Sequence, residues 1–200
     1  MRFSLILALM FSVLFVKATV PVFSQVVPSA EEGSLPFSAG GGYSNYNVDW
    51  GGSRMDGGTL WIDYNANFLI PGLGLEAEAR DISLNRGSNP QNLREDTAAV
   101  GAFYTWRHFR NFRPYGKYLY GLGSVDYANY GGTVPAHATR LVIVPGAGME
   151  YRAYRHVWVR ADYEYQLWAK FPTSASPNFL LLPQGFTIGA MYDFRPFHRR

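Results

Sequence analysis

Apolar and polar residues alternate along eight separate segments of this 200-residue chain. In the clearest of them, 157–167, Val157 and Val159 alternate with Trp158 and Arg160. Because successive side chains of a β-strand point to opposite faces, this period of two predicts strands with one apolar and one polar face. The predicted strands are 36–44, 59–68, 73–80, 97–106, 114–128, 141–152, 157–167 and 187–194.

The segments between these strands are alternately long and short. The long, polar ones are Asn47–Asp56, Asn85–Glu95, Asn129–Arg140 and Ala169–Leu182. The short turns are Ile70–Gly72, His108–Arg113 and Ala153–His156. Membrane-spanning barrels have short periplasmic turns, longer extracellular loops and an even number of strands. We therefore predict an all-β fold, an eight-stranded antiparallel up-and-down transmembrane β-barrel, in which Pro145 marks a bulge or bend.

The charged side chains of the predicted strands lie on the polar face. An arginine or lysine that faces lipid at the bilayer midplane costs ~2–4 kcal/mol, so this face must point into the barrel. A barrel of about eight strands is just wide enough for side chains to fill its interior, where acids and bases can pair. The predicted lumenal charge network consists of Glu76, Glu78, Arg80, Lys117, Glu150, Arg152, Arg160, Asp162 and Glu164.

The apolar face carries aromatic pairs near strand ends, which is the distribution of an interfacial girdle. These pairs are Tyr104 with Trp106, Tyr163 with Tyr165, and Tyr192 with Phe194. A soluble lipid-binding barrel is the alternative, and it requires apolar side chains inside and a charged exterior. The polar face is rich in glycine, serine, threonine and asparagine instead, which favours the membrane barrel.

The last predicted strand resembles the C-terminal β-signal of bacterial outer-membrane barrels. Its members are Thr187, Gly189, Tyr192 and Phe194. With this signal and the motifs Arg113-Pro114-Tyr115 and Gly146–Arg152, residues 35–194 resemble the eight-stranded barrels of the OmpA transmembrane-domain and OmpX type. The resemblance implies a monomer in the cell outer membrane of a Gram-negative bacterium. It also implies contact with outer-membrane lipid and insertion by a barrel-assembly machinery that reads the last strand.

The ends of the chain have their own expected roles. Arg2, the apolar run Phe3–Val16 and the site Val22-Phe23-Ser24 predict a signal peptide over 1–24. Its removal would take away two of the 18 basic residues and leave the remainder nearly neutral against 15 acidic ones. We expect a flexible lead-in over 25–34, the barrel over 35–194 and a short basic tail over 195–200. No peptidoglycan-binding domain is expected after Phe194.

No motif in the sequence indicates a particular reaction. With no cysteine and only scattered histidines we expect no metal and no cofactor, and no basic cluster indicates nucleic acid. We expect a non-enzymatic barrel with a plugged interior and a structural, envelope-integrity or surface-interaction role. A narrow pore is one alternative. A lipid-modifying enzyme is the other, and it would use His137 with Ser124, Thr133 or Thr139, although no catalytic motif supports it.

Overall fold

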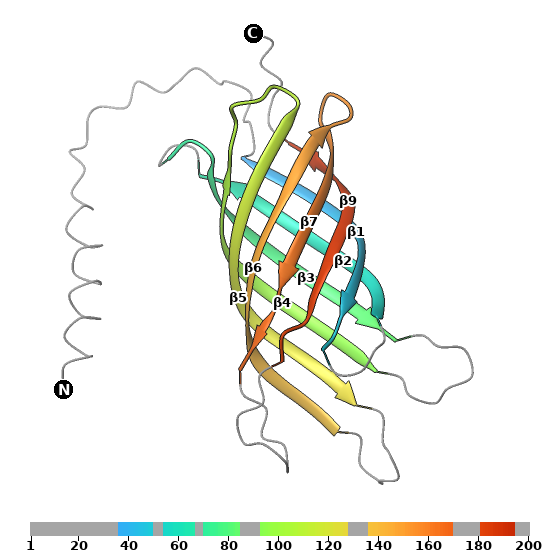
Figure 1. The fold of residues 1–200 in the computed structure, drawn as a ribbon. Helices are drawn as coiled ribbons and strands as arrows, with labels where there is room; N and C mark the ends of the chain where they lie inside the picture. Colours follow the sequence, from blue (N-terminus) through green and yellow to red (C-terminus); the bar gives the residue numbers. More distant parts are fainter. Residues whose placement is uncertain are drawn as a thin grey trace, which may run out of the picture. The chain divides into compact units, whose positions relative to one another are not determined.

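Strands make up nearly all of the part of the chain that the computed structural model describes (Figure 1). This part is 36–49, 54–66, 70–84, 93–127, 136–169 and 181–194. No helix long and apolar enough to cross a membrane occurs in these ranges. The strands are β1 (Phe37–Asn47), β2 (Arg54–Asn65), β3 (Leu73–Ser83), β4 (Arg94–Thr105), β5 (Phe112–Tyr127), β6 (Ala136–Arg152), β7 (Val157–Tyr165), β8 (Leu167–Trp168) and β9 (Gln184–Asp193).

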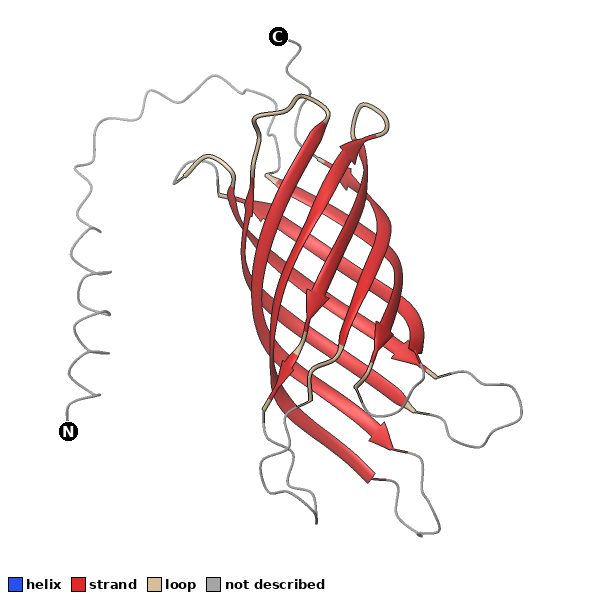
Figure 2. Ribbon diagram, in the orientation of Figure 1, coloured by secondary structure: helices blue, strands red, loops and turns tan. Residues whose placement is uncertain are grey.

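The sheet closes on itself, and all its strand pairs are antiparallel (Figure 2). Strands adjacent in the chain are hydrogen-bonded neighbours from β1 through β7. β9 pairs with β7 on one side and with β1 on the other, in a register that runs from Ser38 opposite Asp193 to Asn47 opposite Gln184. The closed up-and-down barrel predicted from the sequence is therefore confirmed.

β7 and β8 are two parts of one barrel strand, so the barrel has eight strands in its wall. Both pair with β6 in one continuous register, from Gly146 opposite Glu164 to Ile143 opposite Leu167. The Ala169 N–H donates to the Leu141 carbonyl, and such bonds recur at every second residue of an antiparallel pair. Pro145 falls at one of these positions and has no N–H to donate. The predicted bulge in this strand is wrong, because β6 pairs with β5 in one unbroken register through Pro145, and the interruption lies in its other neighbour.

The strands extend further into polar sequence than we predicted. β2 begins at Arg54 and β6 at Ala136, so part of each of the predicted loops Asn47–Asp56 and Asn129–Arg140 is strand. β4 likewise begins at Arg94, and β5 includes Phe112 and Arg113 from the predicted turn. Backbone ladders continue wherever the neighbouring strand continues, whatever the polarity of the side chains. Of the long loops, 50–53, 85–92, 129–135 and 170–180 lie outside the described residues, as does 128 at the end of a predicted strand.

The two faces of the wall are as predicted. Inward side chains are buried, whereas the outward face is a band of exposed apolar residues, which include Leu60, Leu75, Val100, Tyr120 and Ile188. Among the aromatic pairs, Tyr104 with Trp106 and Tyr192 with Phe194 lie at the end of the short turns, called here the short-turn end. Tyr163 and Tyr165 lie toward the opposite, long-loop end, beside Phe186 and Gln184 of β9.

Candidate functional site

The centre of the lumen contains a cluster of ion pairs around Lys117 of β5. Its Nζ lies 2.9 Å from Glu76 Oε1, 2.6 Å from Glu78 Oε2 and 3.5 Å from Asp162 Oδ2, and it also contacts Glu164. The Lys117 side chain is fully buried. The carboxylates come from β3 and β7, neither of which is hydrogen-bonded to β5. These ion pairs therefore cross the lumen and connect separate parts of the wall.

Arg80 of β3 extends this cluster toward β1 and β2. Its Nη2 lies 2.6 Å from Glu78 Oε1 and 2.5 Å from Glu164 Oε2, and its Nε donates to Thr59 Oγ1 at 3.0 Å. The Tyr46 hydroxyl donates to Glu164 at 2.6 Å, while the guanidinium lies 4.3 Å from the centre of the Tyr46 ring. Arg80 is thus held by charge, hydrogen bonding and an aromatic face together.

Arg160 of β7 extends the cluster toward the short-turn end. Its Nη2 lies 2.7 Å from Glu76 Oε2, its Nε 3.1 Å from Asp162 Oδ2, and its Nη1 3.6 Å from Asp63 Oδ2. Its Nε also donates to the Tyr115 hydroxyl at 2.6 Å, and that hydroxyl donates to Asp162 at 2.6 Å. We call the lumenal charge cluster the set Asp63, Glu76, Glu78, Arg80, Lys117, Arg160, Asp162 and Glu164, with Tyr46 and Tyr115.

Seven of the nine predicted network residues lie in this cluster, and Glu150 and Arg152 lie nearer the short turns. There the Arg113 Nη1 is 4.0 Å from Glu150 Oε2 and 3.9 Å from Asp193 Oδ2. The guanidinium of Arg152 lies 4.7 Å from the centre of the Trp158 ring. Asp63, Tyr46 and Tyr115 were not among the predicted members of the network. Asp63 could have been predicted, because it lies on the polar face of the predicted strand 59–68.

Buried apolar side chains lie in the lumen on both sides of the charge cluster. Toward the short turns they are Trp61, Trp158 and Met191. At the long-loop end they form two groups. These consist of Tyr46, Val48, Met55 and Ile82, and of Leu119, Val125, Val142, Val144, Trp168 and Leu181.

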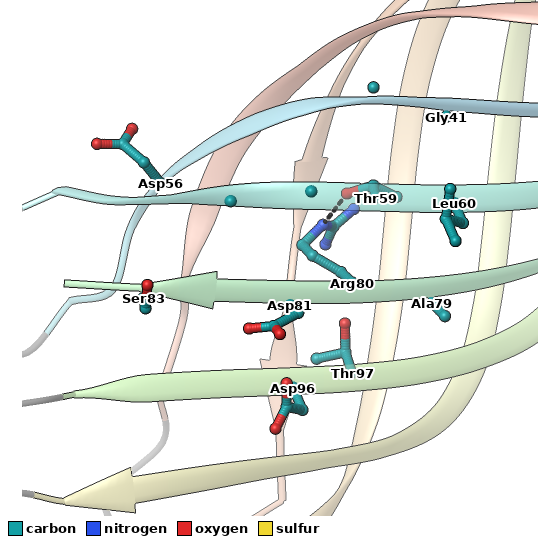
Figure 3. A pocket seen from close by; sticks show the side chains of 13 residues that line it. Gly41, Asp56, Thr59, Leu60, Ala79, Arg80, Asp81, Ser83, Asp96 and Thr97 are labelled. Carbon is teal, nitrogen blue, oxygen red and sulfur yellow. Dashed lines mark hydrogen bonds between the residues drawn. The ribbon is translucent and has the colours of Figure 1, made fainter. Parts of the chain in front are cut away.

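On the outer face, the long-loop end is marked by a change from apolar to charged side chains. A hollow over β1 to β4 is lined by Asp56, Asp81 and Asp96 from three neighbouring strands (Figure 3). Each aspartate has a partner. Arg94 Nη2 lies 2.9 Å from Asp81 and 3.1 Å from Asp96, and the Tyr43 hydroxyl donates to Asp56 at 2.5 Å. The hollow is also lined by the glycines Gly41, Gly42, Gly57 and Gly58.

A second polar group lies on the outer face where β5 and β6 pair. Ser124, named from the sequence with His137, lies with its Oγ 3.3 Å from His137 Nε2 and 3.4 Å from its Nδ1. Asp126, which we did not single out, lies 2.5 Å from His137 Nδ1, and Thr139 Oγ1 lies 3.3 Å from Nε2. The predicted loop position of His137 and Thr139 is wrong, because both are in β6, and Thr133 lies outside the described residues. No three His, Asp or Glu side chains of the described ranges are placed to hold a metal.

The four residues of the predicted β-signal lie along the seam between β9 and β1. Thr187 Oγ1 is 2.8 Å from Ser44 Oγ inside the barrel. A side chain at Gly189 would meet the Gly41 carbonyl at 2.2 Å, so the seam requires a glycine there. Tyr192 and Phe194 pack outside with ring centres 4.9 Å apart. Phe194 follows the end of β9, and its N–H donates to the Phe37 carbonyl at 3.0 Å.

The fold is similar to that of solved outer-membrane proteins. Neisserial surface protein A matches with a TM-score of 0.59 at 13% identity, over 78% of this chain and 95% of that one. Ail, the attachment invasion locus protein of Yersinia pestis, matches with 0.55 at 16%, over 78% and 96%. OprG of Pseudomonas aeruginosa matches with 0.53 at 14%, over 80% and 96%. At these identities the likeness shows the fold alone.

The sequence comparisons give the family. No curated protein is significantly similar in sequence. The profile of the family described as outer membrane protein beta-barrel domain matches residues 7–194, which is nearly the whole chain. This chain therefore belongs to the outer membrane protein β-barrel domain family, and its place is the cell outer membrane.

Proposed function

We propose that this protein is a small outer-membrane barrel with a plugged, non-conducting interior that acts from its outer wall and long-loop end. Its role is then structural, in envelope integrity or in surface interaction. The observation that carries the proposal is the fully buried Lys117, whose ammonium contacts carboxylates of β3 and β7 across the lumen.

The surroundings of the cluster support this proposal. A water-filled path would have to separate these ion pairs or run past the apolar groups on either side of them. Breaking one partner of a buried ion pair typically costs about 3–5 kcal/mol, because the other charge is left uncompensated. A barrel of about eight strands also has just enough interior for its own side chains.

The expected partners follow from the same architecture. Outer-membrane lipid covers the exposed apolar band, since water would not solvate it. Closure between β1 and β9 leaves no unpaired edge to recruit a second copy, which supports a monomer. The barrel-assembly machinery is the expected partner of β9 before closure.

A narrow pore is the competing function, and planar-bilayer recordings on the refolded full-length protein separate the two. We expect no steady channels from wild type. Folding is verified by the altered gel migration of unboiled barrels. Reproducible unitary currents from wild type would overturn the plugged interior. In that case Lys117→Ala, inside the lumen, must change the current, and Arg94→Ala, on the outer face, must not.

A further inference from the structure

The outer face of the barrel carries a serine, a histidine and an aspartate in mutual contact. Ser124 and Asp126 point outward from β5, and His137 points outward from β6. The register sets Asp126 directly opposite His137 and Ser124 opposite Thr139. The two strands are the yellow and gold pair at the long-loop end in Figure 1. Since they are consecutive and hydrogen-bonded there, the wall itself holds the three side chains together.

The contacts assign a different role to each nitrogen of the His137 ring. Asp126 Oδ1 lies 2.5 Å from Nδ1, so the carboxylate accepts the Nδ1 hydrogen and fixes the ring. Nε2 is then the nitrogen whose lone pair can accept a hydrogen. Ser124 Oγ lies 3.3 Å from Nε2 and 3.4 Å from Nδ1. Because the Nδ1 hydrogen is directed at Asp126, Nε2 is the ring nitrogen that can accept from the Ser124 hydroxyl, at a distance within the looser range that nucleophile and base show before substrate binds. The Thr139 hydroxyl, 3.3 Å from Nε2, is a hydrogen-bond donor beside the same position.

The level of this group on the wall points to its substrate. From Ser124 toward the short-turn end, the next outward residues of β5 are Leu122 and Tyr120. From Thr139 in the same direction, the next outward residue of β6 is Leu141. All three are exposed and apolar or aromatic. On β5 and β6, Ser124 and Thr139 are therefore the first aliphatic-hydroxyl positions on the long-loop side of the apolar band. Acyl esters of membrane lipids lie at this boundary between hydrocarbon and headgroup. A lipid beside the wall would bring its ester to Ser124 while its chains stay in the membrane.

We propose that Ser124, His137 and Asp126 form an ester-hydrolysing site for acyl esters of outer-leaflet lipids. Ser124 Oγ attacks the ester carbonyl while its proton passes to His137 Nε2. The ester C–O bond breaks, the proton goes to the departing alcohol, and the acyl group stays on Ser124. Water then attacks the acyl-serine, gives a proton to His137 and releases the fatty acid as Ser124 recovers its hydrogen. Asp126 is the positioning residue, and the site does not depend on the lumen.

The test uses the folded full-length protein in bilayers, with phosphatidylethanolamine or lipopolysaccharide as the substrate and fatty-acid release as the readout. A fluorophosphonate probe followed by peptide mass spectrometry reports the nucleophile. We expect release from at least one substrate and an adduct on Ser124. Ser124→Ala abolishes both, and His137→Gln lowers turnover about 10²–10⁴-fold. Asp126→Asn lowers kcat with little change in KM. The matched control is Ser83→Ala, another serine of the long-loop end, on β3, which keeps full activity.

The two substrates distinguish phospholipid from lipopolysaccharide as the source of the ester. Fatty-acid release that persists in Ser124→Ala would overturn the proposal. The absence of both release and adduct in wild type of confirmed barrel migration would overturn it equally. Neither outcome depends on whether the lumen conducts ions, so this test is independent of the bilayer recordings.

Discussion

The ammonium of Lys117 lies 2.6 Å from the Glu78 carboxylate, and the two side chains are 0% and 5% exposed. They come from strands separated in the wall by β4, so this ion pair links two strands that are not hydrogen-bonded to each other. Pairs of this kind add little over a well-packed apolar interior as long as both partners are present. Their loss is costly because the remaining charge stays buried.

Lys117→Met should therefore destabilise the barrel strongly. The substitution leaves Glu76, Glu78 and Glu164 without their shared ammonium, and we expect a loss of about 3–5 kcal/mol in free energy of unfolding. Urea unfolding in lipid vesicles measures it. Arg94→Met is the control, since the Arg94 side chain is 51% exposed and exposed pairs contribute about 0–1 kcal/mol. Equal losses in the two variants would contradict the central role of Lys117.

Gly189→Ala should impair closure of the barrel. A Cβ there would lie 2.2 Å from the Gly41 carbonyl oxygen and 2.5 Å from Gly42 Cα, so β9 and β1 would have to separate. Overpacking of this kind costs about 1–3 kcal/mol. The folded fraction after refolding into vesicles, read from gel migration, measures the effect. Gly58→Ala should fold normally, because its Cβ would meet nothing nearer than 3.9 Å.

Phe194→Ser should reduce assembly in cells more than deletion of 195–200. Phe194 packs against Tyr192 and its N–H bonds to the Phe37 carbonyl, so it belongs to the closing seam. The amount of folded protein in outer-membrane fractions measures assembly. Refolding of both variants in vitro serves as the control for intrinsic stability. A greater defect from the deletion would place the recognition signal after Phe194.

Val100→Arg should locate the apolar band in the membrane. Val100 is 58% exposed on the outward face, between Ala98 and Ala102 of β4. We expect a loss of about 2–4 kcal/mol in vesicles if it lies near the midplane, because arginine must leave water there. Tyr154→Arg, in a short turn, should cost about 0–1 kcal/mol, as expected for an arginine near the interface. A neutral Val100→Arg would show that this face does not contact lipid.

Much of the barrel could be predicted from the sequence, because a period of two assigns every side chain of a strand to one face. Lys117 and Arg160 could be placed inside for that reason alone, and Ile188 and Tyr192 outside. Strand ends could not be located in the same way. Polar residues such as Asp56 and His137 have the composition of loops, yet they lie in ladders that continue past the apolar band.

The sequence by itself determined the number of wall strands, their faces and the closing strand, since these depend on local alternation and on the order of long and short connections. Only the tertiary structure decided which charges meet. Asp63 lies near Arg160, while Glu150 and Arg152 lie apart from Lys117 at the short-turn end. Only the tertiary structure likewise showed that Asp126 and Ser124 both contact His137. Such contacts depend on the register and stagger between strands, which closure of the barrel fixes and alternation along a single strand does not encode.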